Sequence, residues 1–176
     1  FYDELVFSDP EDLGSIKADV AFSAMPHGAS QEVVPELLKK GRVIDLSADF
    51  RLRDKETYKT WYGEHKAEHL LGEAVYGLPE LYRRDILGAR LIANPGCYPT
   101  SVQLGFAPLL AQAGLVDAAH LIANCASGVS GAGRPPKPHT SFCAVDEDFT
   151  AYGLLDHRHT PEIEQTTGAT VLFTPH

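Results

Sequence analysis

The stretch ADVAFSAMPHGASQEVVPELLKKGRVIDLSADF, residues 18–50, has the pattern of a strand, a helix and a second strand. Its apolar run from Val20 to Ala24 stops at Pro26 and Gly28, as a buried strand that ends in a loop does. A second apolar run begins at Val43. Because the connections are short, we expect the two strands to lie parallel, in a right-handed strand–helix–strand unit.

The segment between the two runs has helical spacing, since its apolar residues fall on one helical face: Val33, Val34, Leu37 and Leu38. Lys39 and Lys40 suit the negative end of the helix dipole, and Gly41 is a candidate cap. The second strand is then expected to run through Val43, Ile44 and Leu46.

The rest of the chain continues with strands and helices. Three more strands are predicted, at residues 89–94, 120–127 and 169–174. After Cys97 a helix is expected on the apolar spacing of Val102, Phe106, Leu109 and Leu110. Gly114 can end this helix, Pro108 should kink or shorten it, and a short helix is expected over 160–168. The parallel pattern therefore occupies about the first 95 residues, and a mixed α+β arrangement the rest.

The composition limits the classes of partner. With 44% hydrophobic and 22% charged residues the chain resembles a globular protein, and its formal charge of −9 disfavours nucleic acid and anionic membranes. No apolar run approaches the roughly 20 residues that span a bilayer. Three cysteines are too few for a disulfide framework, which favours a reducing compartment. Because FYDELVFSDP carries no initiator Met and TVLFTPH stops on a strand pattern, we expect a piece of a longer chain.

One cysteine has an unusual setting. Cys97 lies in NPGCYPT, residues 94–100, after a strand and a Pro-Gly turn and before a helix whose first turn can hold Pro99. A thiol attacks as its thiolate, and free backbone N–H groups at a helix N-terminus stabilise that anion and any oxyanion formed beside it. The alternative is a buried cysteine that packs as a small apolar residue, an interpretation we keep for Cys125 and Cys143.

Two histidines precede a helix start in DHRHTPEIEQ, residues 156–165. Thr160 is a natural N-cap and Pro161 suits the first helical position. Beside a thiol, His157 or His159 could act as general acid or base near neutral pH. Alternatively they form a surface pair or bind a metal, but the sequence has no second cluster to complete a zinc site, so no metal is expected.

Two further motifs suggest anion binding. SGVSGAGRPPKP, residues 127–138, lacks the order of a dinucleotide fingerprint, but its backbone, Arg134 and Lys137 could surround a phosphate or cofactor. The alternative is a flexible surface loop. In DLSADFRL, residues 45–52, Arg51 could clamp a carboxylate or phosphate, or it could pair with Asp49 to brace the loop.

Several stretches together resemble the N-acetyl-γ-glutamyl-phosphate reductases, NADP-dependent enzymes of arginine biosynthesis: MPHG (25–28), DLSADFRL (45–52), YGLPEL (76–81), NPGCYPT (94–100), SGVSGAGR (127–134) and HRHTPEI (157–163). The wider group is similar to aspartate-semialdehyde and glyceraldehyde-phosphate dehydrogenases. The resemblance implies an α/β fold in which residues 1–96 form the C-terminal part of a Rossmann-like parallel, NADP-binding domain. Residues 97–176 would then form part of an α+β catalytic domain of the glyceraldehyde-phosphate-dehydrogenase-like type.

The resemblance also implies a mechanism. Cys97 would attack an acyl phosphate and expel phosphate, and hydride from NADPH would reduce the resulting thioester to the semialdehyde. His159, which adjoins Thr160, is the favoured acid–base group, and His157 is an alternative. The implied substrate-binding residues are Arg51, Arg134, Arg158 and Glu162. The implied cofactor-binding residues are Pro26, His27, Asn94, Gly96, Ser127, Gly128, Ser130 and Gly131.

Other implications concern the whole molecule. Members of this family are about twice this length and begin with a strand and a Gly-rich phosphate loop, so we expect this piece to bind NADP(H) weakly and to turn over poorly. The family implies a homodimer or homotetramer and a small acyl-phosphate substrate, glutamyl or aminoadipyl. A cytoplasmic location is the default expectation.

Two other functions stay open on the sequence alone. A cofactor-independent thiol hydrolase or acyltransferase would also use Cys97 and a histidine, but it would cleave esters or amides without a nicotinamide. A non-catalytic fragment would leave Cys97 no more reactive towards iodoacetamide than a free thiol.

Overall fold

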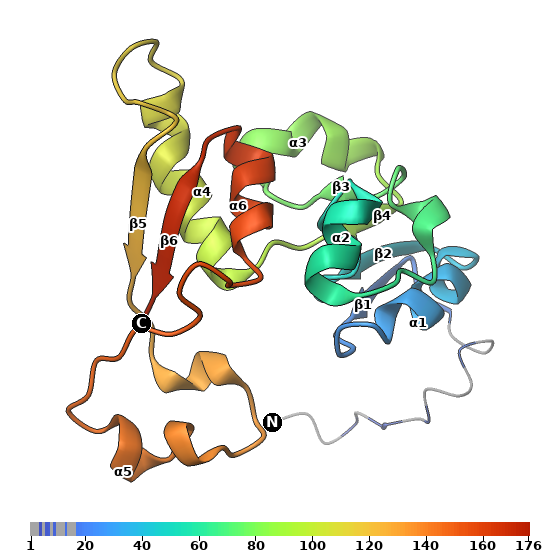
Figure 1. Cartoon of the computed structure of the whole chain (residues 1–176). Coiled ribbons are helices and arrows are strands. Elements are labelled where there is room, and N and C mark those ends of the chain that lie inside the picture. The colour runs from blue at the N-terminus through green and yellow to red at the C-terminus, as the bar shows by residue number, and fades with distance from the viewer. Residues whose placement is uncertain (1–3, 5, 8, 10–12, 14–16) are drawn as a thin grey trace. The chain divides into compact units, whose positions relative to one another are not determined.

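The computed structural model describes residues 4, 6, 7, 9, 13 and 17–176 of the chain. The chain divides into two compact units, Phe1–Gly96 and Cys97–His176 (Figure 1). The first unit has a four-stranded sheet and the second a two-stranded sheet. The stretch FYDELVFSDP, on which the expectation of a longer chain rests in part, lies mostly outside the described residues.

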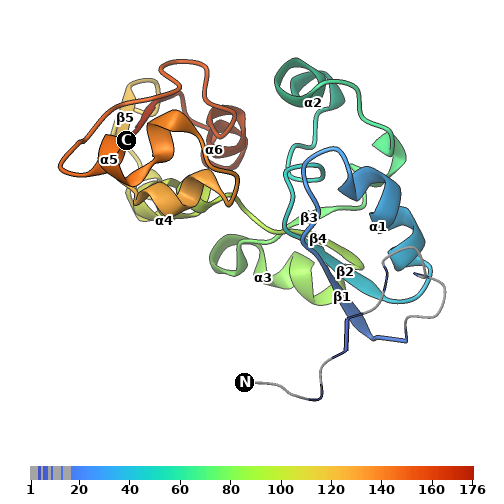
Figure 2. The same cartoon turned by 90° about the horizontal axis from the view of Figure 1, so that it is seen from below.

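The sheet of the first unit is parallel throughout, in the order β1-β2-β4-β3. Its strands are β1 (Val20–Ser23), β2 (Arg42–Asp45), β3 (Val75–Tyr76) and β4 (Leu91–Ala93). The helix α1 (Ser30–Leu38) connects β1 to β2, so the predicted strand–helix–strand pattern with parallel strands is confirmed. Figures 1 and 2 show α1 on one side of this sheet and α3 (Pro79–Gly88) on the other.

The core of the first unit lies between α1 and the sheet. Val34, Leu37 and Leu38 of α1 are buried, and they belong to one apolar cluster with Val43 and Leu91 of the strands. Each such side chain contributes roughly 1.5–3 kcal/mol through its burial. The helical face predicted from the apolar spacing is therefore confirmed.

Three details of the predicted strand–helix–strand unit were wrong. The strand β1 is not a buried strand, since Val20 is 42% and Phe22 is 70% exposed. The strand β2 ends at Asp45, and Leu46 beyond it is 44% exposed. The C-cap of α1 is Lys39 in a right-handed conformation, not Gly41. A Cβ at Gly41 would lie 2.8 Å from the carbonyl oxygens of Ala18 and Asp19, so this position is a glycine because another segment passes close to it.

Residues 53–88 contain elements that the apolar spacing did not indicate. They are α2 (Lys55–Tyr62), the 3₁₀ turn η2 (Glu68–Leu70), β3 and α3. Asp54 caps α2 by accepting a hydrogen bond from the Thr57 N–H at 2.7 Å, and α3 starts at Pro79. Tyr58 is the buried residue of α2, and α3 has none, so neither helix shows an apolar stripe.

In the second unit two helices pack against a short parallel sheet. Its elements are α4 (Cys97–Leu110), β5 (Leu121–Cys125), α6 (Thr160–Thr167) and β6 (Val171–Pro175). The shared core lies between the helices and the sheet and consists mainly of Tyr98, Val102, Leu121, Ala123, Ile163, Val171 and Phe173. Gln103 of α4 is fully buried and donates a hydrogen bond to the Glu162 carbonyl of α6 at 2.9 Å.

The ends of these helices differ from the prediction in small ways. Leu109 is 39% exposed and so does not belong to the apolar face of α4, which ends at Leu110, two residues after Pro108. Thr160 is the first residue of α6, and His159 occupies the N-cap position. Between β5 and α6 the chain forms short turns with mostly exposed residues, namely η3 (Val129–Ala132), η4 (Pro138–Thr140) and α5 (Phe142–Val145). Among the described helices, none is both long and apolar enough to cross a membrane.

Shortening Ile163 to alanine should destabilise the second unit. Ile163 is fully buried between α6 and the sheet, and removing a buried isoleucine side chain to Cβ costs about 2–5 kcal/mol. Ile122→Ala is the matched control, because Ile122 is 63% exposed on β5 and such changes stay within about 0.5 kcal/mol. Urea denaturation measures both, and equal losses would contradict the packing described here.

Candidate active site

Cys97 is exposed at the first residue of α4. This exposure excludes the alternative of a buried cysteine that packs as a small apolar residue. The first N–H groups of a helix have no partners within the helix, so they are available to an anion near this turn. The position therefore combines access to the sulfur with backbone donors.

The other two thiols have different surroundings. Cys125 is half-buried at the end of β5, and this burial raises its pKa, which lowers its reactivity. Cys143 is exposed, but it lies within the four-residue helix α5. Cys97 is the thiol that begins a helix of 14 residues.

The two predicted histidines lie together. The ring centroids of His157 and His159 are 4.7 Å apart. The ring of Tyr98, the residue after Cys97, lies 6.1 Å from His157 and 6.0 Å from His159. Phe173 of β6 packs against His157 at 5.2 Å and against Tyr98 at 5.4 Å. The histidine pair is thus held against the residue that follows the thiol.

The surroundings of His157 favour its neutral form. Burial lowers its pKa, the positive charge of Arg158 lowers it further, and Asp156 opposes both effects. The Nδ1 atom accepts a hydrogen bond from the His159 N–H at 3.1 Å, which places the proton of the neutral ring on Nε2. Because the unfolded chain would bind a proton more readily here, this residue contributes stability that is lost as the pH falls through the window below about 6.5.

Hydroxyl groups surround the same tyrosine. The Tyr98 hydroxyl lies 2.7 Å from Ser127 Oγ and donates to the His176 carbonyl at 3.0 Å, and it accepts a hydrogen bond from the Tyr152 hydroxyl at 3.3 Å. Burial raises the pKa of Tyr152, and so do its bond to Tyr98 and the charge of Cys97.

Tyr98 and Tyr152 were not among the predicted site residues. The place of Tyr98 in NPGCYPT next to Cys97 was a signal that could have indicated it. For Tyr152 the sequence offers no comparable motif. Its contact with Tyr98 joins residues that are 54 positions apart.

The remaining predicted residues of the second unit differ in exposure. Ser127, Gly128, Ser130 and Gly131 are exposed, and Ser127 is the one that reaches Tyr98. Arg134 and Arg158 are also exposed. Glu162 is 1% exposed, and its carbonyl accepts the bond from Gln103. In the part of the chain that the structure describes, no group of three or more His, Cys, Asp or Glu residues could hold a metal ion.

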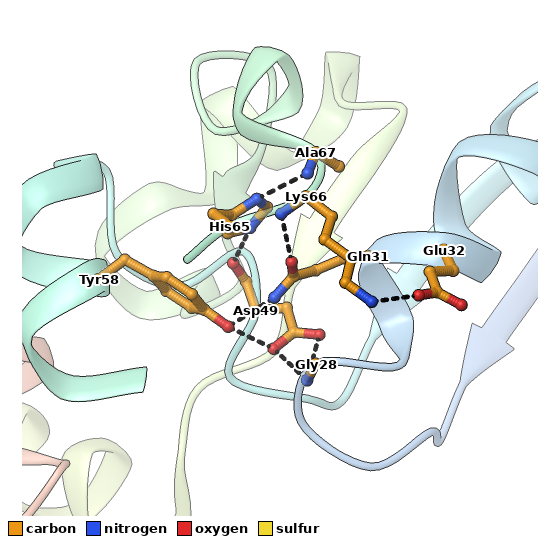
Figure 3. A network of polar contacts seen from close by, with 8 residues as sticks. All are labelled: Gly28, Gln31, Glu32, Asp49, Tyr58, His65, Lys66 and Ala67. Atoms are coloured by element: carbon orange, nitrogen blue, oxygen red, sulfur yellow. Dashed lines mark hydrogen bonds and ion pairs between the residues drawn. The ribbon is translucent and has the colours of Figure 1, made fainter. Parts of the chain in front are cut away.

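In the first unit, polar contacts tie together loops at the carboxyl edge of the sheet (Figure 3). Both oxygens of the buried Asp49 carboxylate lie 2.9 Å from the Gly28 N–H, and Asp49 also accepts a hydrogen bond from the Tyr58 hydroxyl at 2.8 Å. His27 Nδ1 accepts from the Ala48 N–H at 2.9 Å. The MPHG loop after β1 is therefore bound to the loop after β2. Gly28 has a φ of +86°, which favours glycine.

Gln31 and His65 extend the same hydrogen-bond network. Gln31 donates to the Tyr58 hydroxyl at 2.7 Å and accepts from the Lys66 N–H at 2.6 Å. His65 Nδ1 accepts from the Ala67 N–H, so its Nε2–H donates to the Asp49 carbonyl at 2.8 Å. Figure 3 shows these side chains converging on Asp49 from separate segments. Buried polar groups with their hydrogen bonds satisfied make such loops rigid.

Arg51 braces the loops of this edge. It is 7% exposed, its Nε donates to the Asn94 carbonyl at 2.7 Å, and its Nη2 donates to the Leu46 carbonyl at 2.8 Å. The guanidinium thus links the ends of β2 and β4. Neither sequence-based interpretation of Arg51, a substrate clamp or a pair with Asp49, included these backbone contacts. Of the predicted cofactor residues at this edge, Pro26 and His27 are exposed, Asn94 is half-buried and Gly96 is buried.

Two family models match the chain. The one described as "Semialdehyde dehydrogenase, NAD binding domain" matches residues 1–89, and "Semialdehyde dehydrogenase, dimerisation domain" matches residues 97–176. The chain therefore belongs to the semialdehyde dehydrogenase family. The predicted α/β class and the nicotinamide-dinucleotide-binding character of the first unit are consistent with these matches.

Curated relatives are named N-acetyl-gamma-glutamyl-phosphate reductase. The chain is 57% identical to that of Azotobacter vinelandii over 166 residues, covering 93% of the chain and 48% of the relative. It is 56% identical to that of Magnetococcus marinus over 167 residues (90% and 48%), and 52% identical to that of Syntrophobacter fumaroxidans over 182 residues (98% and 52%). The resemblance found in the sequence is confirmed. The chain spans about half the length of these relatives.

Replacing Tyr58 by phenylalanine should destabilise the first unit by about 1–3 kcal/mol, because the buried Asp49 carboxylate and Gln31 amide each lose a partner. Thermal or urea unfolding measures the loss. Tyr82→Phe in α3 is the control, since Tyr82 is only half-buried and its described contacts, with Tyr76 and Arg53, involve its ring. An equally large loss in the control would contradict a specific role for the Tyr58 hydroxyl.

Substituting Arg158→Gln should raise the pKa of His157, because a neighbouring positive charge that disfavours the imidazolium is removed. Asp156→Asn should lower it by the opposite argument. NMR titration of the His157 ring protons measures both changes. Shifts of the same sign in the two variants would contradict the electrostatic account.

Proposed function

We propose that the chain is part of an enzyme that reduces N-acetyl-γ-glutamyl phosphate to N-acetylglutamate semialdehyde, with release of phosphate, in arginine biosynthesis. The observation that carries this proposal is the identity of 52–57% to proteins that bear the reductase name. The exposed thiol of Cys97, with a histidine pair packed on the adjacent residue Tyr98, supports it independently, because acyl transfer needs a nucleophile and a proton carrier.

In this proposal residues 1–96 are a partial NADP-binding domain and residues 97–176 a partial catalytic domain. An all-parallel sheet binds nucleotides outside the carboxyl ends of its strands, and the loops that Asp49 and Arg51 hold lie at that edge. Side chains at that edge are exposed and accessible to a ligand, and so, in the second unit, are those of the loop that follows β5. The proposed cofactor residues are Pro26, His27, Asn94, Gly96, Ser127, Gly128, Ser130 and Gly131.

The first step belongs to Cys97. Its thiolate attacks the acyl carbon, the bond from that carbon to the phosphate oxygen breaks, and phosphate leaves with the electron pair. The acyl group is then held on Sγ as a thioester. Backbone N–H groups of the first turn of α4 can stabilise the negative charge on the carbonyl oxygen during the attack.

The second step needs hydride, which NADPH supplies when it is bound. A histidine then protonates the developing alkoxide of the thiohemiacetal and takes the proton back as the C–S bond breaks. The semialdehyde leaves, and the Cys97 thiolate is regenerated. We propose His159 for this role, with His157, whose neutral form is favoured, as the alternative or as a substrate contact.

Substrate anions require positive groups. We propose Arg134 and Arg158, both exposed, for the phosphate and carboxylate. Arg51 and Glu162 complete the proposed set, and Arg51 also holds the backbone after β2 and β4 in place. A homodimer or homotetramer is proposed from the dimerisation domain matched by residues 97–176. A cytoplasmic location would suit three unpaired thiols.

Cys97→Ser should lower the rate of the reverse reaction by about 10³-fold or more, because the hydroxyl is a far weaker nucleophile than the thiolate. The assay contains N-acetylglutamate semialdehyde, phosphate and NADP⁺ and uses the full-length protein. Cys143→Ser is the control, since Cys143 is an exposed thiol on α5 that has no part in the proposed chemistry. Wild-type activity in Cys97→Ser would remove this residue from the mechanism.

A further inference from the structure

We propose that Tyr98 is a positioning residue for the groups around the Cys97 thiol. Its ring fixes the orientation of the His157 and His159 rings, and its hydroxyl fixes the position of the loop that begins at Ser127. This inference rests on the proposed function, because Cys97, His159 and Ser127 have roles only in that chemistry. In this role Tyr98 does not itself contact a reacting atom.

The ring of Tyr98 contacts both imidazoles. The centroid distances of 6.1 Å to His157 and 6.0 Å to His159 have edge-on geometry, with interplanar angles of 90° and 66°. Such contacts favour one orientation of the rings over others. Phe173 supports Tyr98 from β6 at 5.4 Å, so the tyrosine is itself fixed in the core.

The hydroxyl of Tyr98 makes a second set of contacts. It lies 2.7 Å from Ser127 Oγ and donates to the His176 carbonyl at 3.0 Å. The Ser127 N–H also donates to that carbonyl at 3.0 Å. The start of the 127–134 loop is therefore tied to one phenolic oxygen and to the end of β6.

The position of Tyr98 in the chain connects these contacts to the thiol. Tyr98 follows Cys97 directly in the first turn of α4, so the backbone that the buried Tyr98 ring anchors is the backbone that carries the sulfur. The Tyr152 hydroxyl donates a hydrogen bond to the Tyr98 hydroxyl at 3.3 Å. One side chain thus contacts the proposed acid–base pair and the proposed cofactor loop, and its residue adjoins the proposed nucleophile in the sequence.

A tyrosine that only filled the core would not require its hydroxyl. Tyr98→Phe in the full-length protein keeps the ring and removes the hydroxyl's bonds to Ser127, His176 and Tyr152. We expect the KM for NADP⁺ in the reverse assay, and the Kd for NADP⁺ by calorimetry, to rise about three- to tenfold, because the proposed cofactor loop loses one hydrogen bond, that of Ser127. The pH profile of kcat should stay unchanged, because the histidines keep their packing.

Tyr98→Leu removes the ring as well. We expect kcat to fall about 10²-fold, as small displacements of catalytic groups do. NMR titration should show that the pKa of His157 rises, because water reaches its ring more easily. The charged and titratable groups that surround this ring are Arg158, Asp156, His159, Tyr98 and Tyr152, and only Tyr98 is changed.

Tyr82→Phe is the control for both variants, and it should match the wild type in every measurement. A Tyr98→Phe variant with unchanged KM and Kd for NADP⁺ would overturn the role of the hydroxyl. An unchanged pKa of His157 in Tyr98→Leu would overturn the role of the ring. If the wild type lacks the reductase activity, the proposed function fails, but the calorimetric and NMR readouts still test the positioning by Tyr98.

Discussion

Consecutive residues of an α-helix point about 100° apart, and this constraint decides how the second unit presents its thiol. Cys97 is exposed, while Tyr98 beside it is 7% exposed and belongs to the core. The first turn of α4 is thereby anchored by one residue and leaves the sulfur of the other accessible. The histidine pair lies against the anchored ring, so the proposed nucleophile and the proposed proton carriers share one support.

The first unit depends on buried carboxylates at the end of β2. Asp45 is fully buried and accepts hydrogen bonds from Ser30 at 2.7 Å and Ser47 at 2.5 Å, and Asp49 accepts from Gly28 and Tyr58. A buried carboxylate is tolerated only when its hydrogen bonds are satisfied. These contacts therefore hold the loops at the edge where parallel sheets bind nucleotides. Rigid loops lose little entropy when a ligand binds, which favours affinity.

Much of both units was predictable because the apolar spacing is local. The strands β2, β4, β5 and β6 and the helices α1, α4 and α6 each have an apolar face or run that packs into a core. The strand β1 was also predicted from its apolar run, although its Val20 and Phe22 are exposed. The helices α2 and α3 were missed because α2 buries Tyr58 alone and α3 buries no residue. Gly41 was interpreted as a helix cap. A glycine is needed there because the carbonyl oxygens of Ala18 and Asp19 lie close to it, and no local sequence pattern reveals that approach.

The sequence by itself determined the α/β character, the family resemblance and the prominence of Cys97, His157 and His159, since motifs and periodicity lie within short stretches. Only the tertiary structure decided what these residues touch. The Tyr152 hydroxyl donates a hydrogen bond to that of Tyr98, although the two residues are 54 positions apart in the sequence. Arg51 donates to the Asn94 carbonyl because β2 and β4 are neighbours in the sheet. The spacing of apolar residues indicates which side of a single helix or strand is buried. Contacts between elements depend on how those elements pack in the tertiary structure, and this packing cannot be derived from the spacing.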